Sequence, residues 1–192
     1  MKVNDSGMPE ESYWNSLFDI DGIVDWLPLS KVTATVVEIG CGYGTFTVPI
    51  AQQFAGKLLA FDIEPSMIET ASMNVRNAGL LNVSFRLRDV VEQGVNLESD
   101  SVGMVLLFNI LHFSGNRILL KEASRILKAD GIIAIIHWRK DIPTPRGPAI
   151  RVRPDKDQIL NAAEGLKLHL YRNSTILPPY HWGIQLIKKT TV

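Results

Sequence analysis

Short apolar runs alternate with amphipathic segments along most of the chain. The run 102–108 is apolar at almost every position, and 35–39 is apolar and β-branched, which predicts strands buried on both faces. Between such runs, apolar residues recur at helical spacing, as at Met67, Ala71 and Val75. This alternation predicts an α/β fold, an open parallel sheet with helices on both faces. Strands are predicted over 35–39, 58–61, 83–87, 102–108, 132–136, 166–171 and 183–187, and helices over 45–54, 65–78, 116–128 and from residue 154.

The segment 10–27 has apolar residues at helical spacing with acids between them, and it predicts one or two short helices. We expect residues 1–30 to form a helical lid and residues 31–192 to form a single cofactor-binding domain. A chain of 192 residues is long enough for one domain with a sizeable core.

Composition and charge restrict the cellular compartment and the partners that we expect for this protein. No apolar run is long enough to cross a bilayer, and the polar N-terminus lacks the apolar core of a secretory signal. The one cysteine, Cys41, excludes an internal disulfide, so we expect a cytoplasmic protein without a membrane partner. A formal net charge of zero argues against a nucleic-acid partner.

Three glycines stand at alternate positions directly after the first predicted strand: Gly40, Gly42 and Gly44. Ligands of such sheets bind beyond the carboxyl ends of the strands, and the helix that follows offers free N–H groups to them. A dinucleotide fingerprint, G-x-G-x-x-G, would need its third glycine at position 45, which is Thr45. The spacing therefore speaks against an NAD-dependent oxidoreductase.

The pattern E-x-G-x-G-x-G instead resembles motif I of the class I S-adenosylmethionine-dependent methyltransferases. Further stretches are similar to later motifs of that family: "LLAFDIEPSMIETA", "FRLRDV" and "DSVGMVLLFNILHF". The tail "LPPYHWGIQLIKK" fits the antiparallel hairpin that ends the family's sheet. The resemblance covers about residues 36–187. It implies a single-domain, Rossmann-like three-layer sandwich whose seven-stranded sheet is mostly parallel, with the last strand antiparallel.

The resemblance also implies roles for residues of the cofactor half. Asp62 would accept hydrogen bonds from both ribose hydroxyls, and Ile63 would pack on adenine. Asp89 would accept from the adenine amino group with Val90 beside it, although Arg88 stands where the family often has glycine. Glu38 either braces the glycine loop through its N–H groups or ends its strand in solvent, and Cys41 is a small filler of the loop rather than a nucleophile. The implied cofactor set is Glu38, Gly40, Cys41, Gly42, Gly44, Asp62, Ile63, Asp89, Val90 and Asn109.

The acceptor side is predicted from topology, because the loops after the fourth, fifth and sixth strands should open on the same edge. They carry His112 and His181, each of which could act as an acid/base or orient the acceptor, or could only make local hydrogen bonds. Tyr13 and Trp14 either cover the cofactor or simply pack their helix. The candidates for acceptor binding are Tyr13, Trp14, His137, Trp138, Arg146 and Tyr180; no metal site is predicted.

Segment 139–153 carries five basic residues and one acid, Asp141. It predicts either a solvated loop or a surface that attracts an anionic acceptor through Arg146, Arg151 and Arg153.

The whole sequence, together with the family resemblance, predicts in-line transfer of a methyl group from S-adenosylmethionine to a small molecule, with S-adenosylhomocysteine as product. The alternatives are a non-catalytic cofactor-binding protein that acts through partners, and an RNA or protein methyltransferase that uses the basic loop.

Overall fold

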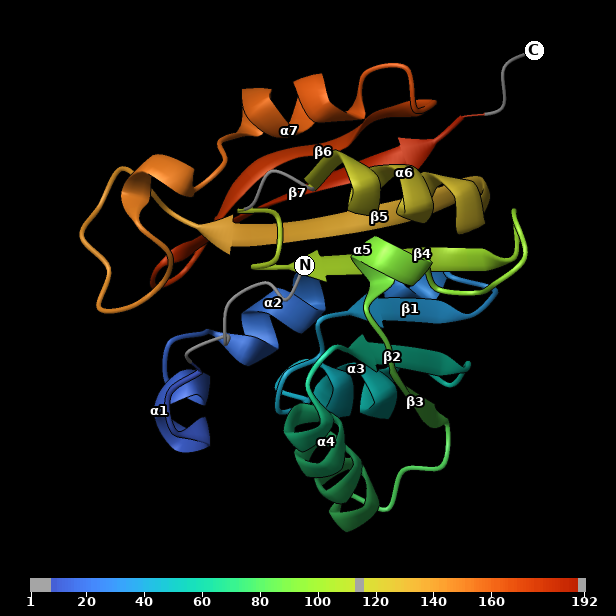
Figure 1. Cartoon of the computed structure of the whole chain (residues 1–192), viewed down its shortest axis with the longest axis vertical. Coiled ribbons are helices and arrows are strands. Elements are labelled where there is room, and N and C mark those ends of the chain that lie inside the picture. The colour runs from blue at the N-terminus through green and yellow to red at the C-terminus, as the bar shows by residue number, and fades with distance from the viewer. Residues whose placement is uncertain (1–7, 113–115, 190–192) are drawn as a thin grey trace.

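A computed structural model describes residues 8–112 and 116–189, and it shows one seven-stranded sheet (Figure 1). The strand order is β3-β2-β1-β4-β5-β7-β6. Strands β1 to β5 are parallel, and β7 runs antiparallel to both β5 and β6. The predicted fold class is thereby confirmed, including the antiparallel last strand. The strands are β1 (Val36–Ile39), β2 (Leu58–Asp62), β3 (Val83–Leu87), β4 (Val102–Phe108), β5 (Leu127–Trp138), β6 (Leu168–Leu177) and β7 (His181–Lys188).

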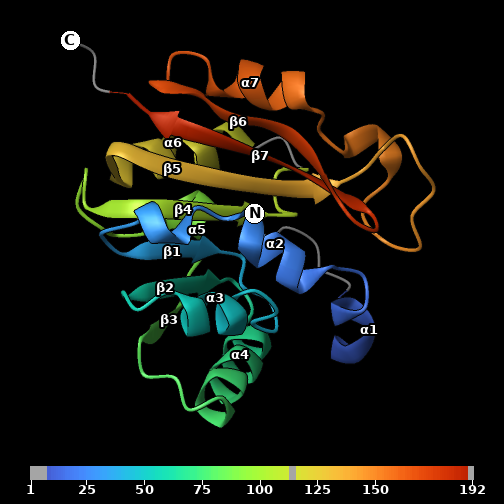
Figure 2. The same cartoon turned by 180° about the vertical axis from the view of Figure 1, so that it is seen from behind.

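Helices cover both faces of the sheet. Helices α5, α6 and α7 lie over the near face in Figure 1, and α2, α3 and α4 lie over the other face, which Figure 2 turns toward the viewer. The chain therefore has three layers, as the alternating pattern predicts. The helices are α1 (Glu11–Asn15), α2 (Ile20–Trp26), α3 (Thr47–Gln53), α4 (Pro65–Asn77), α5 (Val90–Gln93), α6 (Asn116–Ile126) and α7 (Lys156–Ala163), with 3-10 turns η1 (Leu29–Lys31) and η2 (Ile150–Val152).

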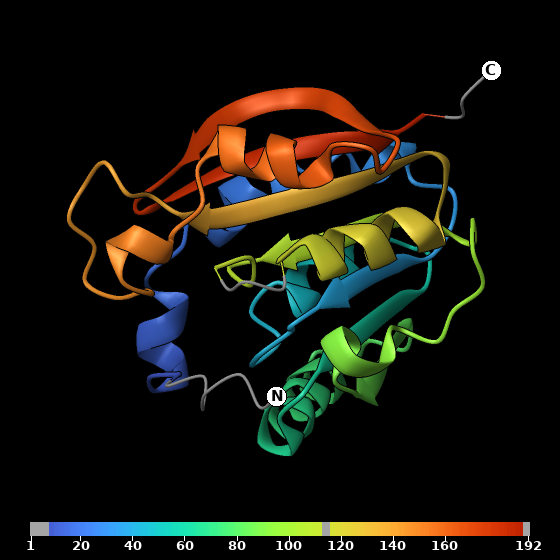
Figure 3. The same cartoon turned by 45° about the horizontal axis from the view of Figure 1, so that its top comes forward.

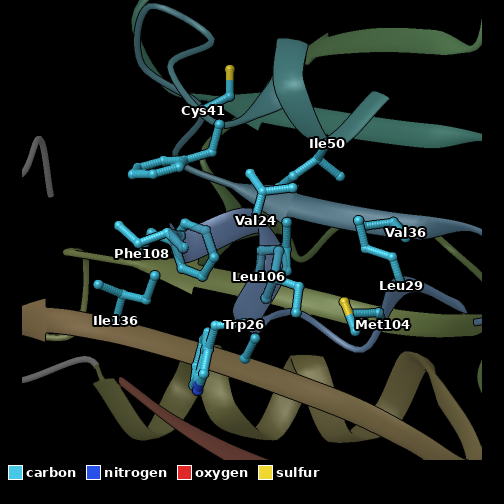
Figure 4. Packing of buried hydrophobic residues seen from close by; sticks show 14 of the residues in the cluster. Val24, Trp26, Leu29, Val36, Cys41, Ile50, Met104, Leu106, Phe108 and Ile136 are labelled. Atoms are coloured by element: carbon cyan, nitrogen blue, oxygen red, sulfur yellow. The ribbon is translucent and has the colours of Figure 1, made fainter. Parts of the chain in front are cut away.

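Strand parity divides the core into two apolar clusters, one on each face of the sheet. Successive side chains of a strand point to opposite faces, so Leu106 and Phe108 of β4 pack against α2 and α3, whereas Leu107 packs against α6. Figure 4 shows part of the first cluster, which includes Val24 and Trp26 of α2, Ile50 of α3 and Leu106 of β4. Every residue of β4 is buried, which explains why this strand is an unbroken apolar run.

The strand order reverses between β1 and β4, because β2 lies on one side of β1 and β4 on the other. In sheets of this kind the ligand crevice lies outside the carboxyl ends of the strands at that point. Helix α1 and the loop 139–153 both lie at the carboxyl end of β5 (Figure 3). The residues predicted for the cofactor and the acceptor thus share one edge of the sheet.

The terminal hairpin is longer than predicted. β6 runs to Leu177 and β7 begins at His181, so only the turn Pro178–Tyr180 separates them, and its pairing Leu177↔His181 closes the hairpin. β6 is an edge strand with nine of its ten side chains at least partly exposed, and its polar segment 172–175 therefore lacks the apolar pattern that predicts a strand.

Two smaller differences between the predicted and the observed elements occur in β5 and α5. Residues 129–131, which separate the predicted helix 116–128 from the predicted strand 132–136, fall inside β5, where Asp130 has φ of +58° and the pairing with β4 shifts register. Helix α5, of four residues, was not predicted; a helix that short leaves little periodicity, and it begins where the Asp89 side chain accepts hydrogen bonds from Val91 N and Glu92 N.

Candidate cofactor and acceptor site

The glycine loop has a backbone that other residues would strain. Gly40, Gly42 and Gly44 have φ of +79°, +54° and +82°. A Cβ on Gly44 would lie 3.2 Å from the Cβ of Ala71, so this glycine allows α4 to pack against the loop. A Cβ on Gly42 would meet only the Met8 methyl within 4 Å among the described residues, at 3.5 Å. The main chain at Gly42 is therefore open to close approach by a ligand.

Asp62, which ends β2, is joined directly to this loop. Its Oδ2 accepts from Gly42 N at 2.9 Å, and its Oδ1 accepts from Glu64 N at 3.0 Å. Burial raises the pKa of the Asp62 carboxyl, and these backbone hydrogen bonds oppose that rise. A carboxylate oxygen has more than one acceptor site, so each oxygen can still accept from a hydroxyl. The next residue, Ile63, is 38% exposed and offers an apolar surface beside the carboxylate.

Asp89 has a structural role that leaves one oxygen available. Its Oδ1 caps α5 by accepting from Val91 N at 3.0 Å and from Glu92 N at 3.1 Å, and Val90 is buried beneath. No hydrogen bond to Oδ2 is found in the part of the chain that the structure describes. Capping a helix and accepting from an adenine amino group are thus compatible.

Glu38 is not solvated at the end of its strand, and that alternative is wrong. The side chain is 2% exposed and accepts a hydrogen bond of 2.5 Å from the hydroxyl of Thr47, the first residue of α3. It braces the helix after the glycine loop through this hydroxyl rather than through loop N–H groups. Burial raises the pKa of the Glu38 carboxyl to about 8, with a smaller contribution from Asp62. Burial also raises the pKa of the Cys41 thiol, which accords with a filler and not a nucleophile.

Three polar side chains gather where β4 and β5 end. Asn109 has φ of +58°, its N–H donates to Ile136 O at 2.8 Å, and both polar atoms of its side chain are buried without a partner in residues 8–112 and 116–189. The rings of His112 and His137 lie 5.8 Å apart, and Nδ1 of His112 and both ring nitrogens of His137 are likewise buried without a partner in those ranges. Burial lowers the pKa of His112, and it lowers that of His137 to about 3.

A second group lies on the other face of the sheet, and we call it the aromatic cluster. Trp138 is its hub: its ring lies 4.2 Å from that of His181, 6.2 Å from Trp14 and 6.5 Å from Tyr180. Phe18 stacks on His181 at 4.4 Å. His181 is fully buried, neither ring nitrogen has a partner within the described chain, and burial lowers its pKa to about 3. The aromatic cluster comprises Trp14, Phe18, Trp138, Tyr180 and His181.

The expectation that His181 lies in a loop after the sixth strand is wrong, because His181 is a strand residue. His137 and Trp138 are the last residues of β5, and His181 and Trp182 are the first residues of β7; only Tyr180 lies in a turn. Because side chains alternate along a strand, His137 faces α6 together with His112, whereas Trp138 faces α1 and α2 together with His181. The structure therefore separates the two candidate bases, His112 and His181, onto opposite faces of the sheet.

The basic segment uses most of its charges internally. Arg139 pairs with Asp141 at 2.6 Å, and Lys140 pairs with Asp155 at 2.5 Å. Arg153 is 6% exposed, and its guanidinium lies over the Trp138 ring at 5.8 Å and donates to the carbonyls of Pro148, Arg139 and Arg146. Its position inside the loop contradicts a role on an anion-attracting surface. Arg146 and Arg151 are exposed at the loop surface.

The N-terminal segment crosses the glycine loop. The Tyr43 hydroxyl donates to Pro9 O at 2.7 Å, the Thr45 hydroxyl donates to Asn15 Oδ1 at 2.7 Å, and the Asn74 amide donates to Glu11 Oε1 at 2.7 Å. Within α1, Trp14 belongs to the aromatic cluster, whereas Tyr13 is 41% exposed. We call residues 8–15 the strap; residues 1–7 of the expected lid lie outside the described residues.

Several of these contacts carry no sequence signal. Tyr43 and Asn74 bond to strap residues that are 34 and 63 positions away in the sequence. Nothing in the sequence around Thr47 indicates that its hydroxyl bonds to Glu38. Phe18 could have been assigned to the site only from knowledge of how β7 is placed. The described residues contain no group of three or more His, Cys, Asp or Glu side chains that could hold a metal ion, and no helix among them is long and apolar enough to cross a membrane.

Known proteins share this architecture. A solved SAM-dependent methyltransferase from Aquifex aeolicus superposes with a TM-score of 0.79 at 23% identity, covering 93% of this chain and 94% of that one. The cyclase SpnF superposes with a TM-score of 0.74 at 13% identity, and the superposition covers 98% of this chain and 86% of SpnF. These likenesses show the fold, and a fold shared with a cyclase does not by itself fix a reaction.

Sequence relatives are also methyltransferases by name. An uncharacterised methyltransferase-like protein of Schizosaccharomyces pombe is 29% identical over 127 residues, which is 65% of this chain and 47% of that protein. Others are named as methyltransferases of a ribosomal protein, of an EEF1A lysine and of a 23S rRNA uracil, at 22–30% identity. The chain spans only 18–59% of the lengths of these four relatives. The family model described as a methyltransferase domain matches residues 36–131, half of the chain, so this protein belongs to the methyltransferase domain family, with the class I fold of S-adenosylmethionine-dependent enzymes.

Proposed function

We propose that this chain transfers the methyl group of S-adenosylmethionine to a small molecule. The observation that carries the proposal is the hydrogen bond of 2.9 Å between Gly42 N and Asp62 Oδ2. It joins the glycine-loop main chain, which could bind the amino-acid part of the cofactor, to a carboxylate that could bind the ribose hydroxyls. The neutral net charge and the short connector after β5 favour a small acceptor over RNA or protein.

The residues present fit the cofactor. Asp62 would hold the ribose, Ile63 and Val90 would flank the adenine, and Asp89 Oδ2 would accept from its amino group. The unpartnered amide of Asn109 lies beyond β4, beside the reversal of strand order, where the methionine end of the cofactor would need polar contacts. Glu38 holds the start of α3, directly after the glycine loop, through its hydrogen bond with Thr47.

The bound cofactor supplies a methyl group that is already electrophilic, so the protein need only position the acceptor and accept a proton. His112 suits the second task. It is half-buried at the ligand edge, its Nδ1 has no partner in the described residues, and its lowered pKa keeps the imidazole neutral and able to accept a proton at neutral pH. His181, buried on the other face, would orient the acceptor through the aromatic cluster.

The strap gives the proposed lid a test. Tyr43→Phe combined with Glu11→Ala removes the strap's hydrogen bonds at Pro9 and Glu11, and it leaves the Asn74 amide bonded to Tyr43 O in the glycine loop. Because each hydrogen bond contributes about 1 kcal/mol, the loss of two should make S-adenosylhomocysteine dissociate up to about 30-fold faster. Stopped-flow tryptophan fluorescence measures this rate, with Tyr171→Phe, which removes a hydroxyl bonded to Lys31 at a distant site, as the control. An unchanged dissociation rate in the double variant would show that the strap is no lid.

Two measurements test the proposed function. Calorimetry should show micromolar binding of S-adenosylhomocysteine and no binding of NAD+. The protein, supplied with methyl-labelled S-adenosylmethionine, should then transfer label to members of a metabolite panel but not to total RNA or a protein mixture. Label found only in RNA or protein would contradict the small-molecule acceptor, and cofactor binding without any transfer would favour the non-catalytic alternative.

A further inference from the structure

We propose that Arg88 is a positioning residue that sets the preference of the site for adenine over a purine without the amino group, because it holds Asp89 in place to accept from that group. This inference rests on the proposed function and adds a specificity-determining residue to its cofactor site. Arg88 acts through residues 89–95, which we call the α5 segment, and not through a contact with the cofactor.

The main chain of Arg88 links the two carboxylates proposed for the nucleoside. Its N–H donates to Asp62 O at 2.7 Å, directly after the point where Asp62 of β2 pairs with Leu87 of β3. Asp89 is the next residue in the sequence. The position of the adenine carboxylate relative to the ribose carboxylate therefore depends on this one residue after β3.

The side chain of Arg88 holds the far end of α5. Its Nε donates to Gly94 O at 2.5 Å, and its Nη2 donates to Gln93 O at 3.1 Å. The last carbonyls of a helix have no partner inside the helix and need one outside it. Helix α5 has only four residues, and a helix that short is not stable without such contacts. Arg88 therefore supplies the bonds that keep α5 folded.

Asp89 holds the near end of the same helix. Its Oδ1 accepts from Val91 N and Glu92 N, so the carboxylate moves with α5 as one unit. Its Oδ2 has no hydrogen bond within residues 8–112 and 116–189 and is the oxygen proposed for adenine. A carboxylate oxygen only accepts, so it binds a base that presents an N–H group there and loses this contact with a base that lacks one. A fixed α5 thus gives selectivity as well as affinity.

Helix α6 holds the end of the α5 segment from the side. Glu122 Oε1 accepts from Val95 N at 2.9 Å, and Arg125 donates to both oxygens of Glu122 at 2.8 and 2.9 Å. These bonds lower the pKa of the Glu122 carboxyl, so it is ionised at neutral pH. Gly94 has φ of +62°, and a Cβ on it would lie 2.7 Å from Glu122 Oε1, so the chain passes close to α6 at this glycine. The segment is thus anchored to α6 at one end and to β2 at the other, and the Arg88 side chain ties the two ends together.

Two nucleosides that differ in one group test the inference: S-adenosylhomocysteine and its 6-deamino analogue, in which hydrogen replaces the adenine amino group. Isothermal titration calorimetry at pH 7 gives a Kd for each. Because a hydrogen bond to a charged acceptor is lost with the analogue, we expect wild type to prefer S-adenosylhomocysteine by about 30-fold. Arg88→Ala should weaken S-adenosylhomocysteine by about 10-fold and the analogue by less than about 2-fold. Arg88→Lys keeps the charge and can bond to one of the two carbonyls, so it should retain a preference of about 10-fold.

Two comparisons separate positioning from a general structural role. Arg86→Ala removes an exposed arginine from the same edge strand and should leave both affinities unchanged. In an Asp89→Ala protein the amino-group contact is already absent, so adding Arg88→Ala should weaken S-adenosylhomocysteine by less than about 2-fold.

Three results would overturn the inference: no preference in wild type, equal weakening of both nucleosides by Arg88→Ala, or a full loss from Arg88→Ala when Asp89 is already replaced. If Arg88→Ala does not fold, a wild-type preference in Arg88→Lys overturns it as well. The levels are distinguishable: if wild type binds S-adenosylhomocysteine and Arg88 does not alter the preference, only this inference fails. If wild type binds neither nucleoside, the proposed function fails with it.

Discussion

Asp62→Ala is expected to weaken the binding of S-adenosylhomocysteine by about 100-fold, the equivalent of about 2.7 kcal/mol. The carboxylate closes β2 beside the glycine loop, and the proposed contacts are two charge-assisted hydrogen bonds to ribose hydroxyls. Hydrogen bonds to charged groups contribute about 1.5–3 kcal/mol each, so the loss of two supports an effect of this size. Isothermal titration calorimetry measures the affinity directly.

Two further variants make the result specific. Asp62→Asn keeps the side-chain size and one acceptor oxygen, and it should cost about 10-fold because the charge is lost. Asp157→Ala removes an exposed carboxylate from α7 and should leave the affinity unchanged. Because Asp62 also accepts from Gly42 and Glu64, thermal unfolding of each variant separates a loosened loop from a lost ligand contact. Wild-type affinity in a folded Asp62→Ala protein would exclude this carboxylate from the site.

The second large effect is expected from Glu38→Gln on the pH dependence of stability. Burial raises the pKa of the folded-state carboxyl from 4.5 to about 8, so the folded protein favours the protonated form. The stabilisation from this group is complete below pH 4.5 and is lost as the pH rises through about 8. The wild-type free energy of unfolding should therefore fall by an amount of the order of a few kcal/mol over that range, and Glu38→Gln should remove most of the fall.

Urea unfolding at several pH values between 5 and 9 tests this expectation. Glutamine can still accept from Thr47 and bears no charge at any pH, so the variant should be more stable than wild type at pH 9 and about equal at pH 5. Glu69→Gln, which removes a carboxylate from the exposed face of α4, should leave the pH profile as in wild type. Parallel profiles for wild type and Glu38→Gln would show that Glu38 is ionised in the folded protein.

Most of the fold follows from the sequence because local patterns and burial agree. β4 is buried along its whole length and β3 alternates apolar and polar residues, so their limits were predicted as observed. The far half of β6 was missed because an edge strand exposed on both faces needs no apolar alternation. α5 was missed because four residues are too few to show a helical period.

The residues assigned to the cofactor mostly follow the neighbouring strands β1, β2 and β3 in contiguous motifs, so their shared position at one edge of the sheet could be predicted from the sequence. The acceptor half depends on long-range geometry. Whether His181 shares a face with His112 is decided by where β7 starts, and a shift of one residue would reverse the answer. Likewise, no local pattern tells a surface arginine from Arg153, whose carbonyl partners become neighbours only after the loop folds over Trp138.

The central claim is that the glycine loop and Asp62 together hold the nucleoside of S-adenosylmethionine. A crystal structure of the protein with S-adenosylhomocysteine tests it most directly. We expect both ribose hydroxyls within hydrogen-bond distance of Asp62, the adenine against Ile63, and the amino-acid end along the main chain of Gly40–Gly42. A nucleoside bound elsewhere, or one in the crevice whose ribose does not contact Asp62, would contradict the account.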